Sequence, residues 1–415
     1  MTDDVVPRAG FGAYRAVLRI PGAAAFSGAG ALARLPQAMI GLGSVLLLTG
    51  LGRSYTLAGL VGGAISLSQG LFSPQVSRLA DRLGQTRVLV PQTIIHALTL
   101  VALVMTARGA APGWVLVALG AAVGASMPQI GAFARARWTA LLPGDRRVDT
   151  ALAVESLIDE VVFIVGPVIV TTLATAVSPV AGMVTATIIV VLGCSLFIAQ
   201  WATEPAPRPA AVDQESTHAI RRPGLLVLVA VFFGLGGLFG MTEVGVFAVT
   251  REAGHAGTAG TLLALWATGS LIAGVAYGAA HWRSPAWRRF LIGVAGMAAG
   301  TVAIAAAAGS LPLLTAALFV GGMATAPTLI TGNTLVPLVV PPNAVTEAYT
   351  WLGVIIFAGA AVGSPIAGIL IDHHGGRAAL WASTAAGGLA LLAVIAGRRW
   401  LSRAAELPES GAAPA

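Results

Sequence analysis

The chain has 415 residues, of which 56% are hydrophobic and only 10% are charged, whereas roughly 25% of the residues in an ordinary soluble domain are charged. A single soluble core stops growing at roughly 250–300 residues, so this composition excludes one soluble domain and indicates apolar surfaces that face lipid. The formal net charge is +7 and all 24 basic residues are arginine. Because most of them lie between apolar stretches, we attribute the charge to membrane orientation and expect no nucleic-acid partner.

Apolar stretches of about 20 residues predict membrane-spanning helices. The sequence contains twelve of them, at 22–51, 55–77, 88–107, 113–138, 150–174, 178–202, 223–250, 257–280, 289–309, 311–338, 346–370 and 378–397. The predicted fold class is therefore an all-α polytopic membrane protein with twelve transmembrane helices. Some spans run together, so hydropathy alone leaves eleven or thirteen helices open.

Arginines are distributed unevenly between the two sides of the predicted membrane. With the N-terminus in the cytoplasm, nineteen arginines lie inside and one lies within a span, and the outside loops hold only Arg53, Arg108, Arg251 and Arg377. Cytoplasmic loops are enriched in basic residues. We therefore expect a multi-pass protein of the plasma membrane with both termini in the cytoplasm.

A stretch rich in proline and polar residues separates two halves of the chain. The predicted parts are a cytoplasmic N-terminal tail, an N-terminal six-helix bundle, a cytoplasmic linker, a C-terminal six-helix bundle and a cytoplasmic C-terminal tail, at 1–18, 19–202, 203–222, 223–402 and 403–415. We expect no cleavable signal peptide, because the first residues are polar.

Prolines recur in phase in the two halves. Pro128 and Pro327 lie in the fourth and tenth predicted helices, 199 residues apart, and Pro167 and Pro365 lie in the fifth and eleventh, 198 residues apart. A proline within a span kinks its helix. Kinks at matched positions predict two pseudo-symmetric six-helix bundles that arose by duplication.

The composition also excludes several kinds of chemistry. Cys194 is the single cysteine, so the chain by itself has no disulfide or cysteine-based metal site. His373 and His374 have no further ligands nearby in sequence, and we expect no metal. The absence of lysine excludes the standard phosphate loop and ATP-driven work. We expect no cofactor and no enzymatic activity, because no arrangement of nucleophile, base and acid is recognisable.

The loop after the second predicted helix carries a motif. It reads Ser77-Arg78-Leu79-Ala80-Asp81-Arg82-Leu83-Gly84-Gln85-Thr86-Arg87. This segment resembles the signature of the major facilitator superfamily, Gly-x-x-x-Asp-Arg-x-Gly-Arg-Arg, at Asp81, Arg82 and Gly84, whereas Ser77 replaces the first glycine. With six helices on each side of a linker, the resemblance covers about residues 19–402.

The resemblance implies a role for this loop. In the superfamily it bridges the two halves on the cytoplasmic side and stabilises the outward-facing state. The residues implied for this cytoplasmic gate are Ser77, Arg78, Asp81, Arg82, Gly84 and Arg87. Asp81 would meet the start of the eleventh helix, near Asn343–Glu347. Alternatively these residues only set topology, an interpretation that we favour for Arg87.

A second resemblance lies in the fifth predicted helix. Gly166 and Pro167 match the centre of the helix-kink motif of drug-exporting members, but Val170 and Thr171 stand where paired glycines would follow. The fourth helix also lacks the arginine of another exporter motif. The resemblance therefore favours export without excluding uptake.

Ionisable side chains within the spans mark candidate functional sites, because a charge near mid-bilayer costs a few kcal/mol. The candidates for proton coupling are Glu243, Glu155 and Asp159. Glu243 can exchange protons, bind a cationic substrate or make a structural hydrogen bond. Glu155 and Asp159 share a helix face, and they form either a proton relay or a salt-bridge network with Arg135 and Arg137.

Polar and aromatic residues within the spans are the candidates for a substrate cavity. They are Arg34, Gln37, Gln129, Asn333, Trp266 and Trp351. Arg34 can bind an anionic group or pair with an acid of its own half. The amides are costly in lipid and favour a hydrated cavity. For the tryptophans, ordinary packing or an interface belt is the alternative.

These features predict a secondary active transporter that alternates access to a midplane site. We expect proton-coupled export of a small, partly hydrophobic organic compound by a monomer in the lipid bilayer, with protons as the coupling ion. One alternative is an uptake porter or facilitator for a sugar or metabolite. Another is a membrane sensor or scaffold that transports nothing.

Overall fold

The computed structural model describes residues 11–145, 147–207, 222–280, 282–341 and 344–406, and within these ranges the chain is helical and contains no strand. The first half contains α1 (Phe11–Leu18), α2 (Ala23–Gly50), α3 (Tyr55–Leu83), α4 (Gln85–Arg108), α5 (Gly113–Ala125), α6 (Ile130–Leu141), α7 (Arg147–Ala176) and α8 (Ala181–Ile198). The second half contains α9 (Pro223–Glu252), α10 (Ala259–Ala279), α11 (Ala286–Ala307), α12 (Leu311–Gly322), α13 (Thr325–Val339), α14 (Val345–His374) and α15 (Gly376–Glu406).

Within the described residues, twelve segments are long and apolar enough to cross a membrane, which confirms the predicted number. The fourth span consists of α5 and α6, and the tenth consists of α12 and α13. The short helix α1 lies in the predicted N-terminal tail, where the sequence analysis predicts no helix. Most of the predicted linker, 208–221, and the chain end, 407–415, lie outside the described residues.

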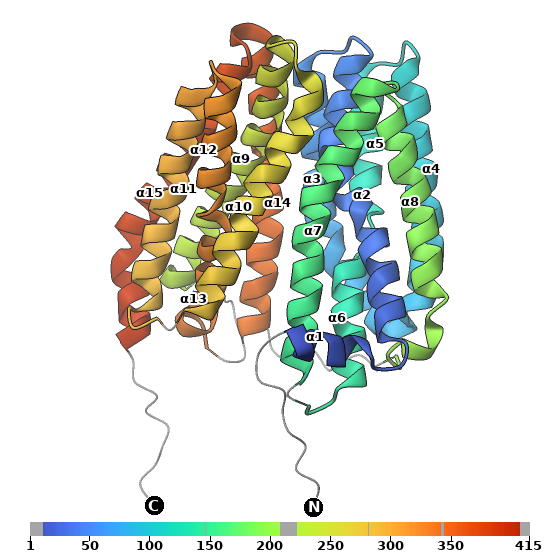
Figure 1. Ribbon diagram of the computed structural model, residues 1–415, viewed down its shortest axis with the longest axis vertical. Coiled ribbons are helices and arrows are strands. Elements are labelled where there is room, and N and C mark those ends of the chain that lie inside the picture. The colour runs from blue at the N-terminus through green and yellow to red at the C-terminus, as the bar shows by residue number, and fades with distance from the viewer. Residues whose placement is uncertain (1–10, 146, 208–221, 281, 342–343, 407–415) are drawn as a thin grey trace, which may run out of the picture.

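The spans form two bundles. Figure 1 shows α2 to α8 on one side of the molecule and α9 to α15 on the other, with α1 and the C-terminal end of α15 at the same end. The fold class predicted from the sequence, two six-helix bundles, is therefore confirmed. We call them the first and the second bundle.

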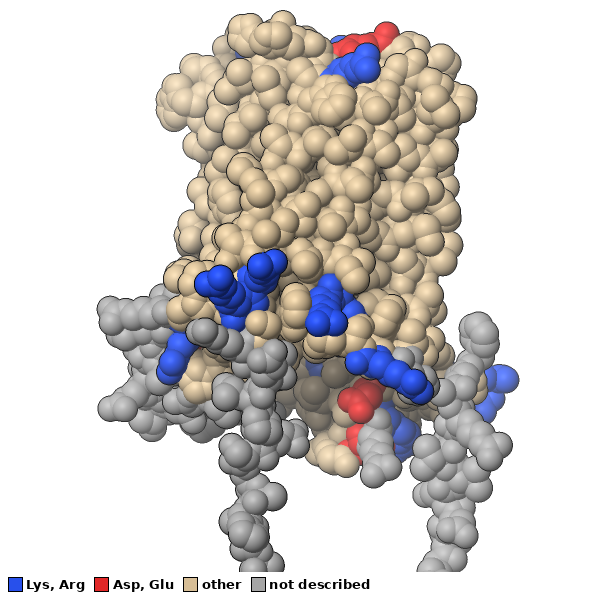
Figure 2. Space-filling model, turned by 90° about the vertical axis from the view of Figure 1, so that its left-hand side faces the viewer, with Lys and Arg blue, Asp and Glu red and all other residues tan. Residues whose placement is uncertain are grey.

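The two ends of the molecule differ in charge. Figure 2 shows the arginine side chains of one face gathered near its lower end, while most of the upper part lacks charged side chains. Of the arginines within the described residues, the helix order places four at the opposite end, Arg53, Arg108, Arg251 and Arg377. We refer to the arginine-rich end and the arginine-poor end.

The fourth span is interrupted at Pro128, between α5 and α6. Two side chains of α4 bind carbonyl groups beside this break. Gln92 Nε2 donates to the carbonyl of Met127 at 3.0 Å, and His96 Nδ1 lies 3.1 Å from the carbonyl of Val123. The tenth span is interrupted at the matching place, between α12 and α13. Pro128 lies within the first break, and Pro327 lies in the first turn of α13, directly after the second break, so a proline accompanies the interruption in each bundle.

Glycines line the places where the two bundles touch. A Cβ at Gly59 of α3 would overlap the carbonyl oxygen of Ser364 on α14, and a Cβ at Gly260 of α10 would overlap that of Pro167 on α7. Pro365 also lies against Gly59. Each bundle therefore provides one helix with a close-approach glycine and one helix with a proline, and only glycine allows this backbone contact.

We expect Gly59→Ala to destabilise the interface between the bundles. The new Cβ must push α14 away, and overpacking of this kind costs about 1–3 kcal/mol. A lower thermal unfolding midpoint of the purified protein in detergent would show this. Gly353→Ala on α14 is the matched control, because Gly353 is exposed and a Cβ added there would meet no atom within 4 Å. Equal midpoints for the two variants would contradict the prediction.

Candidate functional site

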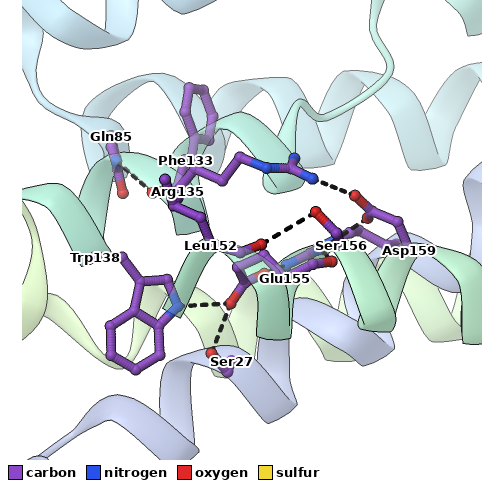
Figure 3. Close-up of polar contacts among 10 residues, drawn as sticks. Ser27, Gln85, Phe133, Arg135, Trp138, Leu152, Glu155, Ser156 and Asp159 are labelled. Carbon is purple, nitrogen blue, oxygen red and sulfur yellow. Dashed lines mark hydrogen bonds and ion pairs between the residues drawn. The ribbon is translucent and has the colours of Figure 1, made fainter. Parts of the chain in front are cut away.

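Glu155 lies at the centre of a buried charge network in the first bundle (Figure 3). It accepts hydrogen bonds from Ser27 Oγ at 2.7 Å and from Trp138 Nε1 at 2.8 Å, and it forms an ion pair with Arg34. The side chains of Glu155 and Arg34 are 0% and 2% exposed. The carboxylate is thus enclosed by donors from α2 and α6.

Asp159 extends this network by one turn of α7. It binds Arg34 Nη1 at 2.8 Å and Arg135 Nη2 at 2.5 Å, and Figure 3 shows the Arg135 side chain reaching toward it. Its side chain is 32% exposed. The charges of the network therefore alternate in sign from one side chain to the next. They run from the buried Glu155 through Arg34 and Asp159 to the partly exposed Arg135.

Arg137, the other arginine suggested as a partner for these acids, binds elsewhere. Its guanidinium donates to Gln85 Oε1 at 2.9 Å, to the carbonyl of Gln200 at 2.8 Å and to Thr203 Oγ1 at 3.0 Å. It also lies 3.9 Å from the centre of the Phe197 ring. A cation is favourable at a helix C-terminus, and Arg137 occupies that position at the end of α8.

The predicted gate motif lies at the arginine-rich end, where α3 passes into α4. Gly84 links the two helices with a φ of 97°, and Glu204 accepts a hydrogen bond from the backbone N–H of Thr86 at 3.0 Å. Asp81 is exposed and makes no hydrogen bond or ion pair with any described residue. Its expected partner region begins at Asn343, which lies outside the described residues.

The remaining residues of the gate motif vary in exposure. Arg78, Arg82 and Arg87 are exposed, and Ser77 is half-buried. In this conformation the motif therefore presents its charges to the surroundings of the arginine-rich end. The contact with Glu204 was not predicted from the sequence, because it joins residues 118 positions apart.

At the arginine-poor end the two bundles are joined by a contact that we call the Asp372 latch, formed by Asp372, Tyr55 and Thr56. Asp372, near the C-terminal end of α14, accepts hydrogen bonds from the backbone N–H groups of Tyr55 at 3.0 Å and Thr56 at 2.7 Å. The hydroxyl of Thr56 donates to it at 2.6 Å. A carboxylate at a helix N-terminus satisfies free N–H groups and the helix dipole. Here that carboxylate comes from the opposite bundle.

The sequence analysis missed this latch, although a signal was present. Asp372 is followed three positions later by Gly375, the same spacing as Asp81 and Gly84. Gly375 and Gly84 also share a positive φ, 82° and 97°. The helices α3 and α14 pack antiparallel, so each carries an Asp-x-x-Gly segment at the end where its partner begins.

A cavity of about 520 Å³ lies between the two bundles. Its wall contains residues of α2, α3 and α7 from the first bundle and of α9, α10, α13 and α14 from the second. Of the predicted site residues, Gln37, Asp159, Glu243 and Trp266 line it. Pro167 of the helix-kink motif also lines it.

The other predicted cavity residues lie elsewhere. Arg34 is buried in the charge network, and Gln129 donates from Nε2 to the carbonyl of Met127 at 3.1 Å. Asn333 and Trp351 are exposed on α13 and α14. None of these four side chains is among the described residues that line the cavity.

Glu243 differs from the acids of α7 in its surroundings. Its carboxylate lies against Gly41 of α2, where a Cβ would be 3.4 Å from Oε1. Among the described residues it has no ion-pair partner. A half-buried carboxyl group without a counter-ion thus lies where the second bundle faces the first.

Gly166 and Pro167 lie where α7 contacts α2 of its own bundle and α10 of the second bundle. A Cβ at Gly166 would lie 2.7 Å from the Cβ of Ala38 on α2, while Pro167 contacts Gly260 of α10. The kink motif therefore allows close packing within the first bundle and against the second. Other polar cavity residues, Gln69, Glu160 and Ser270, were not predicted, because no spacing in the sequence relates α3, α7 and α10.

The fold is shared with solved transporter structures. A point variant of the peptide transporter POT is 13% identical, and the match covers 96% of this chain and 97% of that one with a TM-score of 0.70. The nucleoside transporter NupG is 14% identical, with 92% and 99% covered and a TM-score of 0.67. A bacterial homolog of the human lysosomal transporter Spinster is 15% identical, with 96% and 100% covered and a TM-score of 0.68. Identities this low show the fold alone.

The sequence itself is matched by a family description. Among curated proteins none matches the chain. The family model of the Major Facilitator Superfamily, however, matches residues 26–310 and 244–414, which together span both bundles and the link between them. The chain therefore belongs to the major facilitator superfamily of multi-pass membrane transporters.

Proposed function

We propose that this protein is a proton-coupled exporter of a small, partly hydrophobic organic compound, acting as a monomer in the plasma membrane. The observation that carries this proposal is Glu243, a carboxyl group without an ion-pair partner among the described residues, in the wall of the cavity between the bundles. Intramembrane carboxyl groups mark proton and substrate pathways.

The assignment of the proton to Glu243 follows from a comparison of the candidate acids. Glu155 is enclosed by Arg34, Ser27 and Trp138, and Asp159 already forms ion pairs with two arginines. Glu243 makes no such pair with a described residue, so a proton and a substrate can compete for it. Competition at one site is a simple way to exchange one for the other.

The arrangement of the two ends supports alternating access. The Asp372 latch joins the bundles at the arginine-poor end, whereas Asp81 at the arginine-rich end has no partner among the described residues. Basic residues favour the cytoplasmic side. We therefore assign the arginine-rich end to the cytoplasm and this conformation to the cytoplasm-facing state. In the outward-facing state, Asp81 would pair with the start of the eleventh span.

The test is proton-driven transport in inverted vesicles that contain wild-type protein or Glu243→Gln. A panel of hydrophobic organic compounds is screened for proton release that depends on the compound. We expect the variant to lose at least nine-tenths of this signal, roughly a tenfold change, because glutamine cannot exchange a proton. Asp149→Asn is the control, since Asp149 is exposed and does not line the cavity. Unchanged coupling in Glu243→Gln would contradict the assignment.

A further inference from the structure

The charges of the cavity wall are unbalanced. Three acids line it, Asp159 and Glu160 on α7 and Glu243 on α9, and no arginine or histidine is among the described residues that line it. Arg34 and Arg135 do not line the cavity. Of these three acids, they form ion pairs with Asp159 alone. Two carboxyl groups, one from each bundle, therefore face the cavity with no ion pair to a described residue.

Two buried polar side chains of the wall also lack partners. Gln69 of α3 and Ser270 of α10 are each 6% exposed and line the cavity. Neither side chain makes a hydrogen bond to a described residue. Buried polar groups are normally hydrogen-bonded, so these two are available to a ligand. Both side chains have oxygen atoms that accept hydrogen bonds.

Aromatic rings form much of the remaining wall. They are Phe163, Phe239, Trp266 and Phe357. The rings of Phe239 and Trp266 contact each other, with centroids 5.7 Å apart. Aromatic faces attract cations through the ring quadrupole, most strongly when water is excluded. The same rings provide apolar contact for a hydrophobic body.

We infer that the cavity binds an organic cation, a protonated amine or another onium group carried on an aromatic or apolar body. Glu160 and Glu243 supply the opposite charge from the two bundles, whichever kind of cation binds. Gln69 and Ser270 accept hydrogen bonds from the N–H groups of a protonated amine, and an onium group without N–H is held by charge and ring contacts alone. The aromatic rings contact the body. An anionic ligand such as a carboxylate or phosphate would be repelled by Glu160 and Glu243 and would find no basic side chain among the described wall residues. The inference rests on the proposed function, because it takes this cavity as the transport site.

The test is equilibrium binding to the purified full-length protein in detergent, without any gradient. The probes are tetraphenylphosphonium and tetraphenylborate, which have the same shape and opposite charge, and protein-free micelles give the background. We expect saturable binding of the phosphonium and none of the borate. This comparison needs no variant, so it holds even where a substitution impairs folding.

Variants then locate the charge. Glu160→Gln and Glu243→Gln are each expected to weaken phosphonium binding about tenfold, and Asp149→Asn, an exposed position on the same helix as Glu160, leaves it unchanged. Equal binding of both probes, or wild-type phosphonium binding in both glutamine variants, would overturn the inference.

The outcome is separable from that of the proposed function. Proton-driven export of a neutral compound without phosphonium binding would overturn only the inference. Phosphonium binding without any proton-driven flux would support the inference and overturn proton coupling.

Discussion

Replacing Arg34 by methionine is expected to lower the free energy of unfolding by about 3–5 kcal/mol, the range found when one partner of a buried ion pair is removed. Arg34 is 2% exposed and binds Glu155, which is 0% exposed. Without the guanidinium, the carboxylate of Glu155 stays in an apolar interior with only two neutral donors among the described residues, Ser27 and Trp138. Denaturant unfolding of the purified protein in detergent measures the loss.

Two variants show whether the loss comes from the uncompensated charge. The double variant Arg34→Met with Glu155→Gln is expected to regain most of the stability, because it removes both buried charges and an amide oxygen still accepts hydrogen bonds. Arg135→Met removes the other partner of Asp159, but Arg135 is 39% exposed, so its loss is expected to cost only about 0–1 kcal/mol. A double variant as unstable as Arg34→Met would disprove the explanation.

Replacing Asp372 by alanine is expected to open the arginine-poor end. The variant loses three hydrogen bonds that join α14 to the N-terminus of α3, and single hydrogen bonds to charged groups contribute about 1.5–3 kcal/mol. Because the contact is exposed, we take the low end of that range, which shifts the equilibrium between the two conformations about tenfold.

Spin labels at the arginine-poor end detect this opening. One spin label is attached to each bundle through an introduced cysteine, at Ala110→Cys in the first bundle and at Gly309→Cys in the second. Cys194→Ala removes the native thiol. Double electron–electron resonance then measures the distance between the two labels. We expect Asp372→Ala to add a population with a longer distance. Glu252→Gln is the matched control, because Glu252 binds the N–H of Gly376 within the second bundle. A change of similar size in both variants would contradict a specific role for the latch.

The fold was predictable because lipid imposes a simple requirement on sequence. A span must be apolar for about 20 residues, and this signal is local, so the number of helices and the two bundles follow from hydropathy and repeated prolines. The helix α1 was not predictable in this way, because a short helix outside the spans needs neither length nor continuous hydrophobicity.

The partners of the buried charges were harder to predict. Arg135 and Arg137 are two positions apart, which places them on different faces of α6. Only the packing of α6 decides that Arg135 meets Asp159 while Arg137 meets the carbonyl of Phe197 on α8. The sequence groups Glu155 with Asp159 by spacing, yet their burial differs widely. Such distinctions depend on contacts between distant segments, which periodicity does not contain.

The cavity residues illustrate the same limit. Gln37 and Trp266 line the cavity, whereas Asn333 and Trp351 do not. All four are polar or aromatic residues in apolar helices, so their type alone does not distinguish a cavity wall from another surface. The rotation of each helix about its axis decides which side chains face the opposite bundle.

The glycine contacts between the bundles affect how easily the bundles can move. At four glycines the backbone of one helix lies directly against a carbonyl group of the opposite bundle, because no side chain separates them. They are Gly59, Gly63, Gly260 and Gly368. Interlocked side chains would have to change rotamers, and burying a long side chain costs up to about 1.5–2 kcal/mol of rotamer entropy. Backbone surfaces have no rotamers to exchange. The bundles can therefore roll against each other at these points while the side-chain packing inside each bundle stays intact.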